Sequence, residues 1–422
     1  MKTKYDLIIA GGGTAGCACA YTAAKLGLNV LIIEKNSYLG GSITSSLVVP
    51  AMKTSQNSIN SDFFNILYNE LKNINGAITY CDGNKGWFNP ELVKIVLDKL
   101  LLNAGVDILF ESSIEKIEEN LFDYNVTIYT DNNILESNIL SEHIATRYLV
   151  DATGDAKICQ KLNCEFLNKK NETQPINLRF ILSGIDTKKF TKWIMKYDKD
   201  RDVTTSCNIE GNYYVSTAYT WDTNKNWALK PLFIDAIVKG VLKETDTNYF
   251  QLFSIAGTVD SIGFNCPRII DLQDKAEAYI AGRASILRLT EFCKKYLPGF
   301  ENAYISSIAH SLGIRVSNRV KGKYIYTSDD LRTGKTFTNP VVISNYPIDV
   351  HSSKQDKSKL EIVCKEYQLP IESLIVKDNL FVIGRCISAD FEAQAALRII
   401  PSCFSMGEGL AKYLASISTQ NC

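Results

Sequence analysis

The apolar residues at the start of the chain predict two strands with a helix between them. An apolar run from Tyr5 to Ala10 predicts a buried strand, and Gly11-Gly12-Gly13-Thr14-Ala15-Gly16 follows it. A helix of small residues comes next, and Leu31-Ile32-Ile33-Glu34 predicts a second strand that ends in an acid. Residues 5–35 are therefore predicted to form a βαβ unit.

The same kind of pattern continues after this unit. Apolar residues at helical spacing predict a helix from Pro90 to Leu101, and Gly105 ends it. Alternating positions over 114–130 favour a β-meander. A closing helix follows Pro401. Further strands are predicted at 106–111, 145–150 and 379–385.

The middle of the chain differs from both ends, because strand-like and helix-like runs are mixed there. We predict an α/β fold in which a Rossmann-like nucleotide-binding domain carries an inserted α+β substrate domain. A polar stretch at 352–359 predicts a loop. The expected elements of the insert are strands at 178–183 and 212–219 and helices at 230–242 and 269–296. The expected bounds are 1–165 plus 374–422 for the first domain and 166–373 for the second.

Each glycine of the first turn has a physical role. Gly11 permits a tight turn, Gly13 lets the backbone approach a pyrophosphate, and Gly16 lets the helix pack close to the sheet. Free N–H groups at the helix start near Thr14 favour a phosphate there. Glu34 is placed to accept a hydrogen bond from a ribose hydroxyl, and its charge disfavours NADP. The sequence therefore predicts a dinucleotide site.

Composition narrows the class of protein. The 422 residues include 46 Lys+Arg and 46 Asp+Glu, and this zero net charge argues against a nucleic-acid partner. No apolar run is long enough to cross a membrane, and the early first strand leaves no room for a signal peptide, so we expect a cytoplasmic protein. The 12 cysteines form no C-x-x-C pair and there are three histidines, so no metal site is expected.

Several motifs along the chain, together with the glycine turn, resemble one known family. These motifs are Asp151-Ala152-Thr153-Gly154-Asp155, Leu312-Gly313-Ile314-Arg315, Tyr346-Pro347-Ile348-Asp349-Val350-His351, Gly384-Arg385-Cys386-Ile387-Ser388-Ala389 and Ala396-Leu397-Arg398-Ile399-Ile400-Pro401. They resemble the FAD-dependent oxidoreductases related to fumarate reductase, succinate dehydrogenase and L-aspartate oxidase, and within them a bacterial branch. The resemblance covers nearly the whole chain and implies a glutathione-reductase-type fold with FAD as cofactor.

By this resemblance, the glycine turn holds the ADP half of FAD. The final helix, starting near Ser402, would point its N-terminus at the flavin pyrimidine and stabilise negative charge on the reduced ring. The expected cofactor-binding residues are Gly11, Gly13, Thr14, Ala15, Gly16, Glu34, Lys35, Gly41, Ser42, Ala152, Gly154, Gly384, Arg385, Ser402 and Cys403.

Two departures from the related flavoproteins refine this expectation. Relatives that attach FAD covalently use a histidine in the loop after the second strand, whereas Gly41-Ser42-Ile43-Thr44-Ser45 contains none, so we expect non-covalent FAD. A second GxGxxG motif and a redox cysteine pair are also missing from the sequence. The electron donor or acceptor is therefore left open.

Three arginines are candidates for binding a substrate. Arg398 matches, by resemblance, the arginine that clamps a substrate carboxylate near the flavin, and the planar guanidinium suits such an ion. The alternative is an ion pair with an internal acid such as Glu392. Arg315 and Arg319 would share one face of a helix and clamp an anion. Their alternative is a structural ion pair or plain exposure to solvent.

Two histidines and a cysteine complete the candidates. Asp349 and His351 would lie on the same side of a strand, where the acid orients the histidine as a proton donor or acceptor. His310 is a weaker candidate that would cap or pack a helix at 308–312. Cys403 lies beside the expected flavin helix, which would lower the pKa of its thiol, but a packing role is favoured.

These observations predict an FAD enzyme that moves a hydride between a small molecule, possibly one bearing a carboxylate, and flavin N5. Catalysis is assigned to Arg398, His351 and Arg315. One alternative is a tRNA-modifying flavoprotein, which the neutral charge disfavours. Another is a sensor or electron-transfer subunit without turnover of its own. The substrate, reaction direction and oligomeric state are left open.

Overall fold

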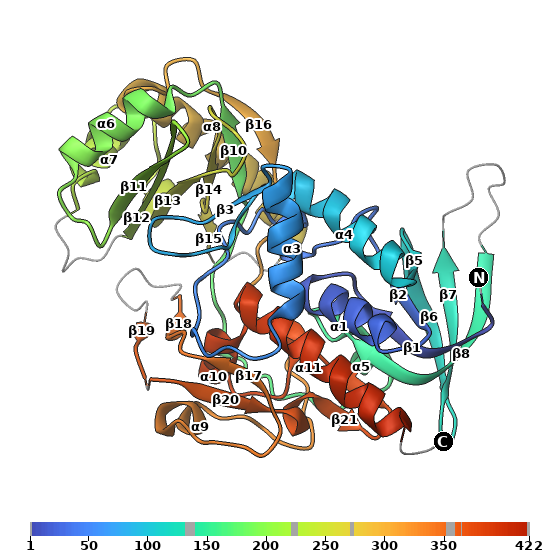
Figure 1. Cartoon of the computed structure of the whole chain (residues 1–422). Helices are drawn as coiled ribbons and strands as arrows, with labels where there is room; N and C mark the ends of the chain where they lie inside the picture. Colours follow the sequence, from blue (N-terminus) through green and yellow to red (C-terminus); the bar gives the residue numbers. More distant parts are fainter. Residues whose placement is uncertain are drawn as a thin grey trace.

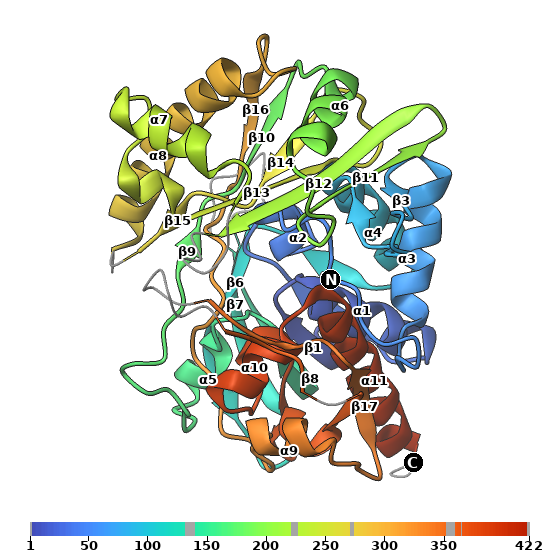
Figure 2. The same cartoon turned by 90° about the vertical axis from the view of Figure 1, so that its left-hand side faces the viewer.

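Two large β-sheets and the helices packed on them make up the molecule (Figures 1 and 2). The structure is a computed structural model that describes residues 2–130, 140–220, 227–270, 274–351, 359–363 and 365–419. Most of the loop predicted at 352–359 therefore lies outside the described residues.

The first sheet is mainly parallel. Across the sheet its strands are β21 (Ile375–Lys377), β22 (Leu380–Val382), β8 (Leu140–Asp151), β1 (Lys4–Ala10), β2 (Val30–Ile33) and β5 (Asp107–Leu109). All neighbours run parallel except β21, which is antiparallel to β22. On the first half of β8, β7 (Tyr124–Thr130) and β6 (Ser112–Glu119) form an antiparallel meander. The predicted βαβ unit and meander are confirmed.

The central strand β1 is buried on both faces, which explains its unbroken apolar run. Leu7 and Ile9 pack in a core shared with three helices on one face. Ile8 and Ala10 join a core with the meander on the other face. The helices are α1 (Thr14–Lys25), α4 (Pro90–Ala104) and α11 (Ile400–Thr419). Helix α4 has the predicted limits at its start, where the Asn89 side chain accepts hydrogen bonds from the first turn, and at Gly105.

The second sheet is antiparallel throughout. Its strands in order are β11 (Thr204–Ile209), β12 (Asn212–Thr220), β13 (Tyr249–Ser254), β14 (Ile262–Phe264), β10 (Phe180–Ser183) and β16 (Tyr304–Ile308). Its apolar residues form a second core with those of α6 (Thr187–Tyr197), α7 (Lys230–Val238) and α8 (Lys275–Tyr296). These elements lie in sequence between β8 and β21, so the predicted fold class, a Rossmann-like core with an inserted α+β part, is confirmed.

Two predicted helices of this part are shorter than expected. Helix α7 ends at Val238, four residues before Leu242. Helix α8 begins at Lys275, because the Asp274 side chain accepts a hydrogen bond from the backbone N–H of Glu277 at 3.0 Å and caps the helix there. Ile269, the expected start, instead lies in β15 (Arg268–Ile269).

The chain after the second sheet returns to the first core. Val341 and Leu369 of this segment are buried among residues of α1 and α11. The domain bounds at 165/166 and 373/374 stay a prediction. The pairs here are β17 (Pro340–Ser344) with β20 (Tyr367–Pro370) and β18 (Ile348–Val350) with β19 (Lys359–Glu361). The remaining short elements are α2 (Ser42–Ser45), α3 (Asp62–Asn73), β3 (Ala77–Ile78), β4 (Trp87–Phe88), α5 (Lys157–Lys161), β9 (Ile176–Asn177), α9 (Ser328–Thr333) and α10 (Phe391–Leu397).

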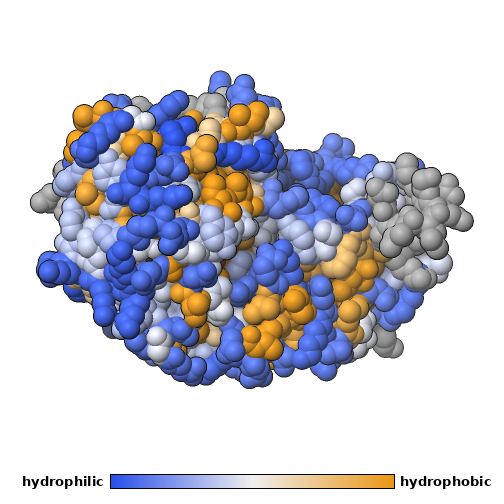
Figure 3. Space-filling model, turned by 90° about the horizontal axis from the view of Figure 1, so that it is seen from above, coloured by the Kyte–Doolittle hydropathy of each residue, from blue (hydrophilic) through white to orange (hydrophobic). Residues whose placement is uncertain are grey.

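The surface carries scattered apolar residues. On the face shown in Figure 3, hydrophobic residues form patches separated by hydrophilic ones. Ile95 and Leu102 of α4 are among the exposed apolar side chains of the protein. Among the described residues, no helix has the length and apolar character needed to span a membrane.

Candidate active site

The turn between β1 and α1 has the shape of a diphosphate cradle. Gly11 has φ +109°, and a Cβ there would lie 2.5 Å from the carbonyl oxygen of Ala152. Gly41 has φ +54°, and a Cβ there would lie 2.7 Å from Cα of Gly13. Two stretches of bare backbone therefore meet at the N-terminus of α1. The first turn of this helix carries no acid, and no side chain among the described residues caps it, so its N–H groups suit a phosphate.

Glu34 lies at the end of β2, next to this turn. One carboxylate oxygen accepts a hydrogen bond from Gly12 N at 2.7 Å, and the other accepts two from Asn36, from the backbone N at 2.9 Å and from the side-chain amide at 2.7 Å. Burial raises the pKa of Glu34, and these hydrogen bonds oppose that shift. The carboxylate holds the glycine turn in place and keeps acceptor sites for a ribose hydroxyl. Lys35, the next residue, is exposed.

Tight packing places the two helices that meet at this turn. A Cβ at Gly16 would overlap the carbonyl oxygen of Gly11, and one at Gly407 of α11 would overlap that of Ala15. Thr14 is itself buried. Because neither glycine leaves room for a side chain, α1 is held against the turn and α11 is held against α1.

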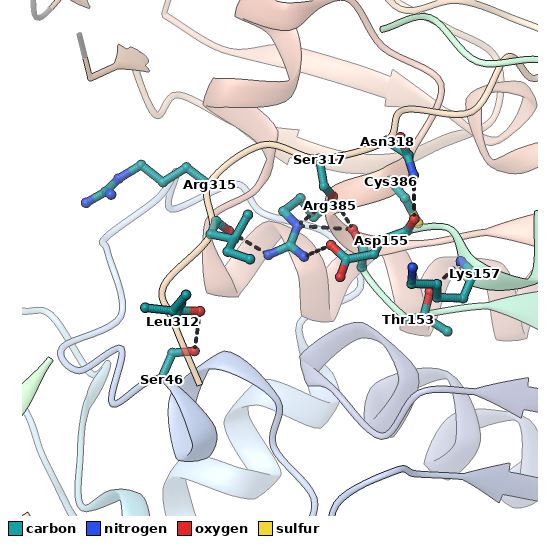
Figure 4. Close-up of polar contacts among 12 residues, drawn as sticks. Ser46, Thr153, Asp155, Lys157, Leu312, Arg315, Ser317, Asn318, Arg385 and Cys386 are labelled. Atoms are coloured by element: carbon teal, nitrogen blue, oxygen red, sulfur yellow. Dashed lines mark hydrogen bonds and ion pairs between the residues drawn. The ribbon is translucent and has the colours of Figure 1, made fainter. Parts of the chain in front are cut away.

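Arg385 ties two distant segments together beneath the expected flavin site. Its guanidinium donates to the carbonyl oxygens of Gly154 at 3.0 Å and Ile314 at 2.5 Å, and to Asp155 Oδ1 at 2.5 Å. Figure 4 shows Arg385 between Asp155 and the segment carrying Ser317, with the Arg315 side chain pointing away from it. The Arg385 side chain is therefore occupied by protein groups, while a Cβ on Gly384 (φ +82°) would lie in ordinary contact, 3.6 Å from Cβ of Ala15.

Helix α11 begins at Ile400, two residues before the start expected near Ser402. The Ser402 hydroxyl is buried and has no hydrogen-bond partner among the described residues, which fits a group that the cofactor would supply. Cys403 does not have the lowered thiol pKa that its position beside the expected flavin helix would favour. Burial raises its pKa to about 11, so the packing role is favoured.

Arg398 lies two residues before the start of this helix, in a cluster with the predicted Asp349–His351 pair. Its NH2 group lies 3.6 Å from Asp349 Oδ2 and donates to the Asp349 carbonyl oxygen at 3.2 Å. The alternative for Arg398, an ion pair with an internal acid, therefore has a partner in Asp349; Glu392, the example acid, pairs with Arg332 and Lys359 instead. Asp349 Oδ2 also lies 3.3 Å from His351 Nε2, so the predicted orientation of the histidine by the acid is confirmed.

His351 is held as a neutral imidazole. Burial and the charge of Arg315 lower its pKa to about 3. Nε2 faces the carboxylate of Asp349, and Nδ1 lies 2.8 Å from NH2 of Arg268, which assigns the proton to Nε2 and a lone pair to Nδ1. The neutral ring carries no additional proton near neutral pH, which argues against the proton-donor role considered from the sequence. A proton-acceptor role needs Arg268 to move from Nδ1.

Arg315 and Arg319 do not share a helix face, and this prediction is wrong. Residues 314–319 form no regular element, and the backbone on either side pairs with distant strands. Arg319 forms an ion pair with Glu172 and donates to Leu167 O at 3.1 Å. This is the structural ion pair that the sequence offered as the alternative to an anion clamp. Arg315 instead points toward the cluster, where NH1 donates to Pro175 O at 2.6 Å.

His310 is likewise not part of a helix, because β16 ends at Ile308 and the next residues are irregular. It is exposed and lies edge-on to the Tyr38 ring, with 6.1 Å between centroids. It lies outside the cluster formed by Arg398, Asp349 and His351.

Sequence reasoning missed two arginines and a tyrosine of the site. Arg268 lies with its guanidinium carbon 3.8 Å from the centroid of the buried Tyr249 ring. Arg179 donates from Nε to Asn265 Oδ1 at 2.9 Å. Neither arginine belongs to a motif. In the sequence each is marked only by being a single charge at the edge of an apolar strand-like run.

A pocket of 580 Å³ adjoins the cluster. It is lined by residues 168–169, 172–176, 269–270 and 316–319. Two of its wall residues also contact the cluster, because Gln174 Oε1 accepts a hydrogen bond from His351 N at 3.2 Å and Pro175 O accepts one from Arg315. Within the described ranges, no group of three or more His, Cys, Asp or Glu side chains is placed to hold a metal ion.

The parallel sheet, the glycine cradle and the acid at the end of β2 define a dinucleotide-binding α/β protein. The chain belongs to the FAD-dependent oxidoreductase family, whose model matches residues 6–422, and it is therefore an FAD-dependent enzyme. The glycine cradle and the Ser402 hydroxyl, which has no hydrogen-bond partner among the described residues, both fit this cofactor.

Individual relatives are more distant. Digeranylgeranylglycerophospholipid reductase 1 of Methanococcoides burtonii is 52% identical over 40 residues, 10% of each chain. Ferredoxin–NADP reductase of Malacoplasma penetrans is 26% identical over 226 residues, 41% of this chain and 69% of that protein. The p-nitrophenol 4-monooxygenase PnpA from Pseudomonas putida DLL-E4 matches in structure with a TM-score of 0.51 and 11% identity, over 100% of this chain and 82% of that one. The chain spans a tenth or less of the first curated relatives, so these likenesses support the fold alone.

Proposed function

We propose that this enzyme moves a hydride between a small carboxylate-bearing substrate and N5 of non-covalently bound FAD, as the resemblance to fumarate reductase relatives implies. The observation that carries the proposal is the meeting of Arg398, Arg315 and His351 just before α11, the helix expected to face the flavin. When bound, FAD supplies the two-electron chemistry. The guanidinium groups would hold the substrate carboxylate and fix the reacting carbon.

The proton balance assigns a role to His351. In the oxidising direction FAD would supply the acceptor for a hydride from a substrate C–H bond, and a second hydrogen would leave the adjacent atom as a proton. His351 would accept that proton at Nδ1, and Asp349, 3.3 Å from Nε2, would stabilise the resulting imidazolium. In the reducing direction the same proton returns to the product. The partners are then a small molecule and a separate electron donor or acceptor, with no nucleic acid.

An anaerobic reduction assay with the purified FAD-loaded protein tests the proposal. Flavin absorbance is followed while hydroxy acids, amino acids and saturated or unsaturated carboxylic acids are added to oxidised and chemically reduced enzyme. Arg398→Ala should retain FAD and lose substrate-driven change of the flavin spectrum. Arg332→Ala removes a surface arginine paired with Glu361 and Glu392, and serves as the matched control. Unchanged kinetics in Arg398→Ala would remove this residue from the mechanism.

A further inference from the structure

The C-terminus of α5 brings two cysteines together. Helix α5 ends at Lys161, and Asn163 after it has φ +52°. Cys164 N donates to Cys159 O at 2.9 Å, and Asn163 N donates to Gln160 O at 3.1 Å. These two hydrogen bonds define a Schellman turn, in which the side chain of the third residue from the helix end meets that of the second residue after the cap. In α5 these two side chains are Cys159 and Cys164.

The two thiols are in contact and differ in character. Cys159 is buried, whereas Cys164 is partly exposed. A hydrogen bond from the Cys159 thiol lowers the pKa of Cys164, and the charge of Lys377 adds to this effect. The same hydrogen bond, together with burial, raises the pKa of Cys159. An accessible thiol with thiolate character therefore lies against a buried thiol that keeps its proton.

This pairing arises from the turn and not from a sequence motif. No redox cysteine pair was expected from the sequence, because the cysteines form no C-x-x-C motif. The Schellman turn instead joins cysteines that are five positions apart, 159 and 164. Two cysteines whose Cβ vectors diverge cannot be bridged without moving the backbone. Here the thiols already meet and the two main chains are hydrogen-bonded, so a disulfide requires only a small movement.

We infer that Cys164 and Cys159 form a redox pair that a peroxide converts to a disulfide. The Cys164 sulfur attacks a peroxide oxygen, the O–O bond breaks, and the other oxygen leaves as water with the thiol proton. The Cys159 sulfur then attacks the sulfenic sulfur of Cys164, the S–S bond forms, and the hydroxyl leaves as a second water with the second thiol proton. The two thiols are oxidised by two electrons, and one hydrogen peroxide is reduced to two waters.

The pair lies beside the end of β8 that the glycine cradle contacts. The backbone N–H of Cys159 donates to Asp151 Oδ2 at 3.0 Å, and Asp151 Oδ1 accepts a hydrogen bond from the Thr153 hydroxyl at 2.7 Å. The carbonyl oxygen of the next residue, Ala152, lies 2.5 Å from the place of a Cβ on Gly11. These hydrogen bonds have ordinary lengths, so a shift of α5 that closes the S–S bond would lengthen them. The disulfide would thereby loosen the strand end that supports the cradle and weaken FAD binding.

Peptide mapping of the full-length protein tests the pair. FAD-loaded protein is treated with hydrogen peroxide, the remaining thiols are alkylated, and trypsin digestion is performed without reductant. Because Lys161 lies between the two cysteines, trypsin places them in separate peptides, 158–161 and 162–169. We expect these peptides to be joined by a disulfide that dithiothreitol cleaves. Two unreacted thiols, or a sulfinic acid at Cys164 without a cross-link, would overturn the inference.

Two serine variants locate the reaction. Cys164→Ser should abolish the cross-link. Cys81→Ser replaces an exposed cysteine of another segment, whose Sγ lies 3.9 Å from Ser206 O, and should leave the cross-link unchanged. A cross-link from Cys159 to Cys386, which approaches the same strand end with Sγ 3.7 Å from Asp151 O, would overturn the assignment of the partner. If Cys164→Ser does not fold, the peptide map of the unmodified protein still decides the question.

FAD affinity tests the effect on the cradle. FAD-free protein is prepared in the dithiol and disulfide forms and titrated with FAD by flavin fluorescence. The Kd should be about threefold to tenfold higher in the disulfide form, as for the loss of one hydrogen bond. Dithiothreitol should restore the lower Kd, and peroxide-treated Cys164→Ser should keep it. Equal Kd values in the two forms would overturn the coupling of this pair to the cofactor site.

Discussion

The contact between Gly41 and Gly13 tests whether this turn holds FAD. Gly41 precedes α2 with φ +54°, and a Cβ there would lie 2.7 Å from Cα of Gly13. An alanine at position 41 must push one backbone stretch away from the other. We predict that Gly41→Ala loses affinity for FAD while the parallel sheet stays folded.

The expected magnitude separates into two costs. A non-glycine residue in the left-handed region costs about 1–2 kcal/mol, and this cost falls on folding. Overpacking a close contact costs about 1–3 kcal/mol. Because Gly13 must return to its position to bind the diphosphate, this second cost falls on FAD binding, and the Kd should rise about fivefold to 150-fold.

Gly105→Ala is the matched control. Gly105 also has a positive φ, +84°, but a Cβ there would meet nothing within 4 Å. Urea unfolding should show a loss of stability in both variants. Titration of apoprotein with FAD, followed by flavin fluorescence, should show a raised Kd only in Gly41→Ala. A Gly41→Ala protein that binds FAD within about twofold of the unmodified protein would refute the assignment of the turn to the diphosphate.

Three further predictions concern the substrate half of the site. The His351 pKa of about 3 lies below its ordinary value of 6.5, so only the unfolded chain takes up this proton as the pH falls. Stability should therefore fall by about 1.5 kcal/mol more in unmodified protein than in His351→Gln between pH 6.5 and 5, by urea unfolding. Arg315→Gln should stabilise the ligand-free enzyme by about 1 kcal/mol or more, because it removes a buried charge, and it should weaken anion binding. Thermal melts without dicarboxylate measure the first effect, and the added stabilisation by dicarboxylate measures the second. Cys403→Ser should leave substrate-driven flavin reduction unchanged in stopped-flow traces.

The cofactor half of the site follows from local sequence. Gly11, Gly13, Gly16 and Glu34 lie within one βαβ unit, and each is required by a backbone geometry that the short segment itself creates. The strand, turn and helix periods are also local signals, which explains why this unit and the meander agree with the structure. The limits of α7 and α8 were harder to predict, because they depend on capping and on contacts with the second sheet.

The segment around Arg315 shows why the substrate half resists such prediction. Gly313 N donates to Asn177 O at 2.8 Å, and Val320 N donates to Cys386 O at 3.0 Å. Both partners lie far away in the sequence, so the segment satisfies its flanking backbone groups through distant residues instead of in a helical turn. Local spacing of Arg315 and Arg319 carries no information about these distant partners.

The arginines near Asp349 extend the same argument from geometry to energy. Each arginine is compatible with its own strand or loop, and the conflict arises only where the fold brings Arg179, Arg268 and Arg398 within electrostatic reach of Arg315, with Asp349 as the opposing charge. A sequence under selection for stability alone would replace at least one of these buried cations, because the repulsion and desolvation oppose folding. Their joint presence is explained if an anion neutralises them during function, since binding to the native state offsets the cost. Buried like charges that oppose folding are thus the feature of this site that points most directly to an anionic ligand.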